Sequence, residues 1–452
     1  MRVNLNVAIV AMVNNTSNEP SNTSRNIVEC PELLPVKTED KHIVFKGEQY
    51  NWNSREQGII LGSFYYVYFA IQLLGGLLSE RFGAKWCFGI GIGMSGVLSL
   101  LTPLAARWGT AAFIAVRVLE GLFQGVTYPS ITTATSRWSP KEERSRISTI
   151  VFMGVPMGIV VSMSVSGWLS STDLLGGWPS VFYVFGTVCL IWFLFWSTFM
   201  YEFPADHPGI SKEELQYIEK DQEEKLQKID VPWKDIFTSL PMWAVAAAHF
   251  GYIFGSFMLV MEMPSFLNQI LHFEVDVDGL LSSLPYIAQV FGCYISSYVA
   301  DRLRKSGKFS ITAIRKCSNS IGMIGPGLCM LGVTVSGCSP WITVTLSCVA
   351  LAFCGCTYSG FNVTHVDMSP ELAGILYGMT NTLASLNGII CPTIAGYFLM
   401  SGPTIANWNK VFYITSAMFI VPGIIFHLFA SAEKQPWGLT TEKDSKCEVT
   451  KF

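Results

Sequence analysis

Twelve apolar runs separated by short polar breaks constrain this chain of 452 residues more than any other feature. A helix that crosses the hydrocarbon core of a bilayer needs about 20 mostly apolar residues. Only 14% of the residues are charged, against about one-quarter in a soluble globular protein. The pattern therefore predicts a polytopic helical membrane protein and excludes a soluble enzyme, a nucleic-acid binder and a disordered scaffold. The runs lie near residues 1–13, 56–79, 86–106, 110–134, 146–170, 178–201, 239–261, 279–300, 313–336, 340–363, 373–400 and 408–431.

The first run is too short to cross the hydrocarbon. Residues 1–13 would cover less than about 20 Å at the helical rise of 1.5 Å per residue. We interpret Met1 as an internal methionine and expect the start of helix 1 to be missing. A naturally short re-entrant segment is the alternative.

The runs form two sets of six on either side of a charged stretch. The chain has 30 basic and 33 acidic residues, of which residues 203–235 hold 14. The net acidity of this stretch favours a solvated connector over a calmodulin-target helix. We expect a six-helix bundle over 1–202, a cytosolic linker over 203–238, a second six-helix bundle over 239–432 and a cytosolic tail over 433–452.

The basic residues predict the orientation in the membrane. With the N-terminus inside, 21 of the 30 basic residues fall on the cytosolic side, as the positive-inside rule requires. Both termini are then cytosolic, and the loop 14–55 lies outside. That loop carries N-glycosylation sequons at Asn14, Asn15 and Asn22, and glycans are added on the lumenal side. The charge count and the sequons thus indicate the same topology.

The cysteines give little evidence of a framework or a metal site. Cys354 and Cys356 lie in an apolar run without partner ligands, which excludes a zinc knuckle. Cys30 and Cys338 both fall in loops placed outside. A disulfide between these two is compatible with the topology, although the sequence does not require one.

An acid followed by an arginine recurs at the same place in both sets of runs. Glu80 and Arg81 follow the second run, and Asp301 and Arg302 follow the eighth. An acid at a cytosolic helix end can cap one helix and pair with a neighbouring terminus. We expect these four residues to hold the inner mouth shut in one conformation and to release it in another. Ordinary positive-inside charge is the plainer explanation.

Two parallel six-helix halves with these repeated pairs resemble the major facilitator superfamily. Shorter motifs along the whole chain resemble its anion:cation symporter family, which contains sodium-dependent phosphate cotransporters, sialin and vesicular glutamate transporters. The motifs are RVNLNVAI at 2–9, RVLEG at 117–121, GVTYP at 125–129, ERSR at 143–146, SLPY at 283–286, HVDMSP at 365–370, AGILYG at 373–378 and EKQPW at 433–437. The resemblance implies an all-α major facilitator fold, with two six-helix bundles related by pseudo-two-fold symmetry and helix 1 truncated. It also implies cation-coupled symport of a small anion by alternating access.

Ionisable residues inside the runs are the candidates for binding, because a charge in hydrocarbon costs at least about 2–3 kcal/mol. Arg117 and Arg2 offer planar guanidinium groups that suit carboxylate or phosphate oxygens. Tyr65 and His249 are further candidates for contact with the substrate. A structural ion pair between Arg117 and Glu120, one turn apart, is the competing interpretation.

Glu120 and Gln124 are the candidates for coupling to a cation. Glu120 can neutralise Arg117 in the empty site, or it can accept and release a proton. Proton-coupled members of the resembled family often carry a second glutamate where this chain has Gln124, and sialin-like members tend to carry a histidine at the position of Thr132. Glutamate carriers have an arginine at the position of Tyr252. These departures favour sodium-coupled phosphate transport, with a proton-coupled, sialin-like exporter of acidic sugars or acidic amino acids as the alternative.

Three residues near the ends of runs allow two interpretations each. His365 and Asp367 indicate a structural cap between the tenth and eleventh spans, because a metal pair would need a third ligand. Glu262, at the outer end of the seventh run, is either a gate or a side chain that reaches interfacial water, and we favour water.

Other functional classes lack support. No nucleophile–base pair, metal cluster or channel filter is recognisable, so we expect no enzyme activity, no metal, no cofactor beyond a coupling Na⁺ or H⁺, and no nucleic-acid partner. A non-transporting membrane sensor is the remaining rival. We expect a monomer in the plasma membrane or in a lysosomal or vesicular membrane, with the bilayer and a small anion as its partners.

Overall fold

The computed structural model describes residues 3–13, 29–30, 48–52, 54–140, 143–219, 231–271, 278–400 and 402–438, and these residues are almost entirely helical. The first half contains α1 (Asn4–Met12), α2 (Ser54–Ser63), α3 (Tyr65–Phe82), α4 (Ala84–Trp108), α5 (Thr110–Gly125), α6 (Thr127–Trp138), α7 (Arg144–Ser171) and α8 (Pro179–Phe199). The linker region carries α9 (Lys212–Glu219) and α10 (Trp233–Thr238). The second half contains α11 (Leu240–Phe257), α12 (Met263–Gln269), α13 (Asp278–Lys305), α14 (Ile311–Val335), α15 (Pro340–Cys354), α16 (Phe361–Met368), α17 (Ala373–Ser385), α18 (Asn387–Leu399) and α19 (Ile405–Phe429).

The twelve apolar runs coincide with these helices, so the all-α membrane fold is confirmed. Ten helical segments within the described part of the chain are long and apolar enough to cross a membrane, and α13 adds another helix of 28 residues. Several spans consist of two helices that meet at a break. A π-helical turn at Met258–Glu262 joins α11 to α12, and a 3₁₀ turn at Gly355–Ser359 joins α15 to α16. Broken spans of this kind are tolerated where the irregular backbone is buried or lines a cavity.

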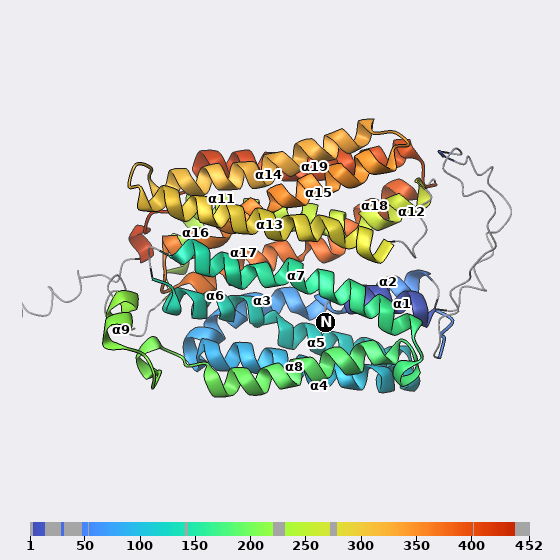
Figure 1. The fold of residues 1–452 in the computed structure, drawn as a ribbon, viewed down its shortest axis with the longest axis horizontal. Coiled ribbons are helices and arrows are strands. Elements are labelled where there is room, and N and C mark those ends of the chain that lie inside the picture. The colour runs from blue at the N-terminus through green and yellow to red at the C-terminus, as the bar shows by residue number, and fades with distance from the viewer. Residues whose placement is uncertain are drawn as a thin grey trace, which may run out of the picture.

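The two halves lie side by side, with α7 of the first half facing α13 of the second (Figure 1). α17 of the second half packs against both α3 and α6 of the first half. Glycine permits the closest approach there, because a Cβ on Gly76 would lie 2.8 Å from the carbonyl oxygen of Gly374. Small residues of this kind let membrane helices pack backbone to backbone.

The bundle has two ends, which we call the linker end and the loop end. The linker end carries α9, the start of α7 and the turn between α3 and α4 (Figure 1). Gly83 forms that turn with a φ of 92°, which favours glycine, so α4 begins directly after α3. The loop end carries residues 48–52 and the turn between α14 and α15. At the loop end Cys30 forms a disulfide with Cys338, so the bond that the sequence left open is present.

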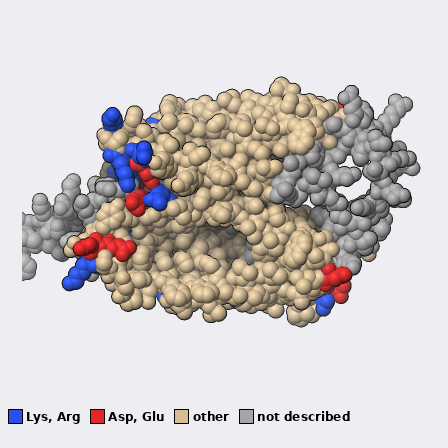
Figure 2. Space-filling model, viewed as in Figure 1, with Lys and Arg blue, Asp and Glu red and all other residues tan. Residues whose placement is uncertain are grey.

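Charge is distributed as a bilayer requires. In Figure 2 the lysine, arginine and acidic side chains gather near the linker end, with a smaller group near the loop end, and the surface between them is almost free of charge. Charged side chains are costly in hydrocarbon, so the uncharged band fits a surface that faces lipid.

Candidate functional site

A cavity of about 690 Å³ lies between the two halves and is lined by side chains from both. Tyr65 of α3, Gln124 of α5 and His249 of α11 lie on its wall, so three of the predicted site residues come together. Arg2 lies outside the described residues, as do the three sequons at Asn14, Asn15 and Asn22.

Rings, hydroxyl groups and amides dominate the wall of this cavity. No lysine, arginine, aspartate or glutamate belongs to the lining within the described part of the chain. Aromatic pairs close the space between the halves: Tyr128 of α6 stacks on Tyr377 of α17 with ring centroids 6.1 Å apart, and Tyr65 meets Phe257 of α11 at 5.8 Å. Seven tyrosines line the cavity, at positions 65, 68, 128, 252, 286, 358 and 377.

Arg117 and Glu120 form a buried ion pair on α5, with side-chain exposures of 3% and 1%. The guanidinium carbon of Arg117 lies 5.3 Å from the ring centroid of Phe64. Neither member of the pair is part of the cavity lining. Both nevertheless share a helix face with Gln124, because positions i, i+3 and i+7 lie on one side of a helix. The pair therefore lies on the same face as Gln124, about one to two helical turns closer to the loop end.

His249 belongs to a hydrogen-bonded group of three side chains in the second half. Its Nδ1 lies 2.9 Å from Oγ1 of Thr380 on α17. The same Oγ1 lies 2.8 Å from Nε2 of His365 on α16. All three residues are buried. The sequence indicated His249 and His365 separately, but nothing in it distinguished Thr380 from other threonines in apolar helices.

A buried charge cluster joins the halves at the linker end. Oδ2 of Asp367 accepts a hydrogen bond from Nε of Arg315 at 2.8 Å, and Oδ1 lies 3.7 Å from Nη1 of Arg144. Arg144 begins α7 of the first half, whereas the other two residues belong to the second. Sequence reasoning missed this cluster, because its three members are far apart along the chain.

The cluster corrects one interpretation of the sequence. Asp367 does not cap α17, since a buried carboxylate needs positive partners more than it needs a helix N-terminus. Ser369 instead accepts a hydrogen bond from the amide of Leu372 at the start of α17. The link between the tenth and eleventh spans is present at His365, which reaches α17 through Thr380.

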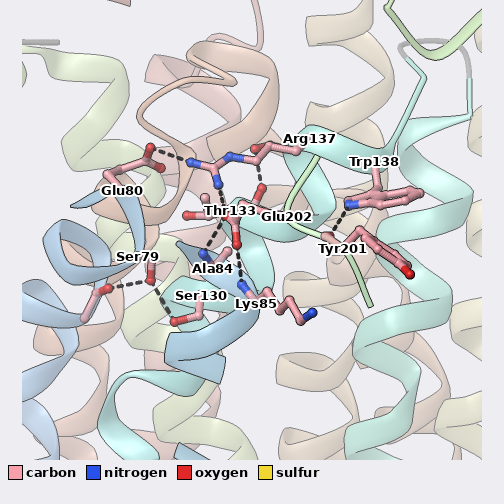
Figure 3. Close-up of polar contacts among 12 residues, drawn as sticks. Ser79, Glu80, Ala84, Lys85, Ser130, Thr133, Arg137, Trp138, Tyr201 and Glu202 are labelled. Carbon is pink, nitrogen blue, oxygen red and sulfur yellow. Dashed lines mark hydrogen bonds and ion pairs between the residues drawn. The ribbon is translucent and has the colours of Figure 1, made fainter. Parts of the chain in front are cut away.

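Of the predicted pair Glu80–Arg81, only Glu80 belongs to a polar network, and that network stays within the first half (Figure 3). Oε2 of Glu80 accepts from Nη2 of Arg137 at 2.9 Å, and Arg137 also pairs with Glu202 after α8. The carboxylate of Glu202 accepts from the amide of Ala84 at 2.7 Å and so caps α4. This network therefore ties α3, α4, α6 and the end of α8 together. The side chain of Arg81 points elsewhere, with its guanidinium carbon 5.5 Å from the ring of Phe82.

Asp301 and Arg302 face the first half across a second cavity of about 290 Å³ at the linker end. Glu143 and Arg146 at the start of α7 line its other side. Arg302 also lies over the ring of Tyr298 at 5.1 Å. Charged residues of both halves thus face each other across this cavity. The equivalent pair in the first half, Glu80 and Arg81, does not line it.

Residues 41–392 match the family model for the Major Facilitator Superfamily. The chain belongs to the major facilitator superfamily. A solved structure with the same fold agrees with this assignment. It is the proton:xylose symporter of the superfamily, bound to 6-bromo-6-deoxy-D-glucose, and it superimposes with a TM-score of 0.61 at 13% sequence identity. The superposition covers 84% of this chain and 87% of the symporter.

Curated relatives within the superfamily come from the anion:cation symporter family, so that resemblance is confirmed. Human sialin is 38% identical over 442 residues, covering 97% of this chain and 87% of sialin. A putative inorganic phosphate cotransporter of Drosophila ananassae is 36% identical, with 99% and 92% covered. Vesicular glutamate transporter 1 of Bos taurus is 36% identical, with 99% and 77% covered. This major facilitator protein is therefore a multi-pass membrane transporter and not an enzyme.

Proposed function

We propose that this protein is a cation-coupled symporter that carries a small anion through the cavity between its halves by alternating access. The observation that carries the proposal is the position of that cavity, which both halves line near the middle of the bundle. Secondary transporters of repeated architecture bind their substrates at such an interface. Relatives named as an inorganic phosphate cotransporter and a vesicular glutamate transporter, together with sialin, support an anion as the cargo.

An organic anion fits the cavity better than inorganic phosphate. A volume of about 690 Å³ lies in the range of about 300–1,000 Å³ that is typical of pockets for drug-sized molecules. Tyrosine rings suit a carbon skeleton, and hydroxyl and amide groups suit its polar substituents. The features that favoured phosphate, Gln124, Thr132 and Tyr252, keep that ion as the second candidate.

Arg117 supplies the positive charge in this proposal. Its Nε has no hydrogen-bond partner among the described residues, so one donor remains for an anion that displaces Glu120. Gln124 links the pair to the cavity because it shares their helix face. Glu120 would then be released from the ion pair when cargo binds.

The linker end is proposed to face the cytosol, with the loop end outside or in a lumen. The disulfide supports this orientation, because disulfides persist in oxidising compartments. The collection of charge at the linker end also supports it (Figure 2). The membrane would be the plasma membrane or a lysosomal or vesicular membrane, and the proposed working unit is a monomer.

Uptake measurements test the function. Purified full-length protein in liposomes is given labelled phosphate, sialic acid, glutamate or p-aminohippurate, each with and without a sodium gradient and at two external pH values. We expect one organic anion to accumulate in a gradient-dependent manner and phosphate to accumulate less. Flat uptake of all four anions by correctly inserted protein would favour the sensor hypothesis.

Glycosylation tests the orientation separately. Replacing Asn14, Asn15 and Asn22 together by glutamine removes the three acceptors in the loop 14–55. The protein expressed in animal cells should then migrate faster on a gel, by the same amount as wild type treated with a peptide N-glycosidase. An unchanged mobility for both would place that loop on the cytosolic side.

A further inference from the structure

Three side chains connect the cavity wall to the linker end of the second half. His249 belongs to the wall, Thr380 lies behind it, and His365 lies two residues before Asp367, which bridges the halves. The hydroxyl oxygen of Thr380 is within 2.9 Å of one imidazole and 2.8 Å of the other. We call His249, Thr380 and His365 the histidine triad.

The hydrogen-bond partners of the triad determine where its protons lie. Nδ1 of His365 is 3.2 Å from the carbonyl oxygen of Asn362, which can only accept, so Nδ1 carries a proton. The hydroxyl of Thr380 has a second acceptor in reach, the carbonyl oxygen of Tyr377 at 3.1 Å. It can therefore donate in either of two directions.

The triad satisfies its hydrogen bonds with two different numbers of protons. In the first state the Thr380 hydroxyl donates to the unprotonated Nε2 of His365. In the second state Nε2 has gained a proton and donates to Oγ1 of Thr380, whose hydroxyl has turned to donate to the carbonyl of Tyr377. Nδ1 of His249 donates to Oγ1 in both states. Rotation of one hydroxyl is thus sufficient for uptake of one proton, with no buried donor left unpaired.

The surroundings of the triad link this proton to an anion. Among the described residues, no carboxylate hydrogen-bonds to the triad. The positive charge that a proton adds to His365 is therefore not neutralised by a hydrogen-bonded acid. An opposite charge nearby favours the charged form of a titratable group. An anion in the cavity next to His249 would supply it. The elements packed around the triad carry further titratable or charged groups, among them Tyr128, Tyr252, Tyr358, Tyr377, Arg144, Arg315 and Asp367, together with Tyr65, Tyr68 and Glu80 of α3, Arg137 of α6 and Lys410 of α19.

We propose that the histidine triad is the coupling-ion site and that it holds one proton, on Nε2 of His365, while the cavity holds the anion. The coupling ion is then H⁺ and not Na⁺. Proton and anion each favour binding of the other, as thermodynamic linkage requires of coupled ligands. The inference rests on the proposed function insofar as it needs an anion in the cavity, and it competes with the coupling role considered for Glu120.

Replacing Thr380 by valine tests the triad with both imidazoles kept. Liposomes containing Thr380→Val are assayed for exchange of the anion that accumulates in the uptake panel, and for accumulation driven by a pH gradient. Exchange needs no net proton movement, so we expect accumulation to fall at least about tenfold more than exchange does. Thr382→Val is the matched control, because within the described part of the chain the hydroxyl of Thr382 bonds the carbonyl of Gly378 on its own helix and no residue of the triad. The proposal would be overturned if Thr380→Val lost exchange and accumulation equally, or if it accumulated the anion normally. It would also be overturned if accumulation were lost in Glu120→Gln and not in Thr380→Val.

Infrared spectroscopy tests protonation of the triad without a transport assay. Infrared difference spectra of the purified full chain between about pH 5 and about pH 8 record protonation of imidazole. We expect one imidazolium signal to disappear in His365→Gln and to shift its midpoint in Thr380→Val but not in Thr382→Val. If the uptake panel fails while this signal is present, the proposed anion transport is wrong and the proton site stands. Identical spectra for wild type and His365→Gln would remove the proton site whatever the cargo.

Discussion

Asp367→Asn should abolish anion uptake. The substitution removes the only carboxylate that faces Arg144 and Arg315 in the buried cluster described here. Removing one partner of a buried ion pair costs about 3–5 kcal/mol, because the other charge stays buried without compensation. We expect uptake of the transported anion to fall to background in the liposome assay.

A milder variant separates gating from folding. Arg144→Gln breaks the contact between the halves but keeps the 2.8 Å hydrogen bond between Arg315 and Asp367 inside the second half. The conformation that is open at the linker end should then become more populated. The increase is about tenfold for each 1.4 kcal/mol by which this contact stabilises the closed conformation. Labelling of Thr149→Cys, which lines the second cavity, by a thiol reagent added from the linker side should accelerate accordingly. An unchanged labelling rate would show that the cluster does not hold the halves together.

Arg117→Gln should lower uptake at least about tenfold, since an anion would lose a charge-assisted hydrogen bond. The single variant also leaves Glu120 buried without its partner, so lost uptake alone does not identify the cause. The double variant Arg117→Gln/Glu120→Gln carries no unpaired charge. We expect it to reach the membrane at the wild-type level and to remain inactive. Recovery of uptake in the double variant would assign the pair to bracing the bundle.

Arg107→Gln is the control for loss of an arginine. Arg107 pairs with Glu48 at 3.2 Å, but their side chains are 59% and 56% exposed. Exposed pairs contribute about 0–1 kcal/mol, so this variant should transport normally. A comparable loss of uptake in Arg107→Gln would mean that the effect at position 117 is not specific to the buried guanidinium.

The spans and three cavity residues were predictable because both follow from local pattern. Apolar length predicts a spanning helix whatever its neighbours are. Gln124 was indicated because members of the resembled family often carry a glutamate there, and His249 because an ionisable residue inside an apolar run is unusual. Side-chain partners across the bundle follow a different rule. Arg315 and Asp367 are 52 residues apart, and their contact depends on how α14 and α16 pack.

Glu80 illustrates the limit of repeated motifs. The sequence places Glu80 and Asp301 at equivalent positions, and the same role was expected for both. Glu80 instead pairs with Arg137 within its own half, whereas Asp301 lines a space shared by the two halves. Equivalent positions in the repeat do not have equivalent neighbours, since the packing around them differs.

The bond between Cys30 and Cys338 also has a consequence for biosynthesis. Its two thiols are 308 residues apart in the sequence, and eight of the twelve apolar runs lie between them. At about 5–20 residues per second of translation, Cys30 would wait roughly 15–60 s for its partner to emerge. During that interval its thiol has no disulfide partner, so this bond closes only after the loop that carries Cys338 has been delivered.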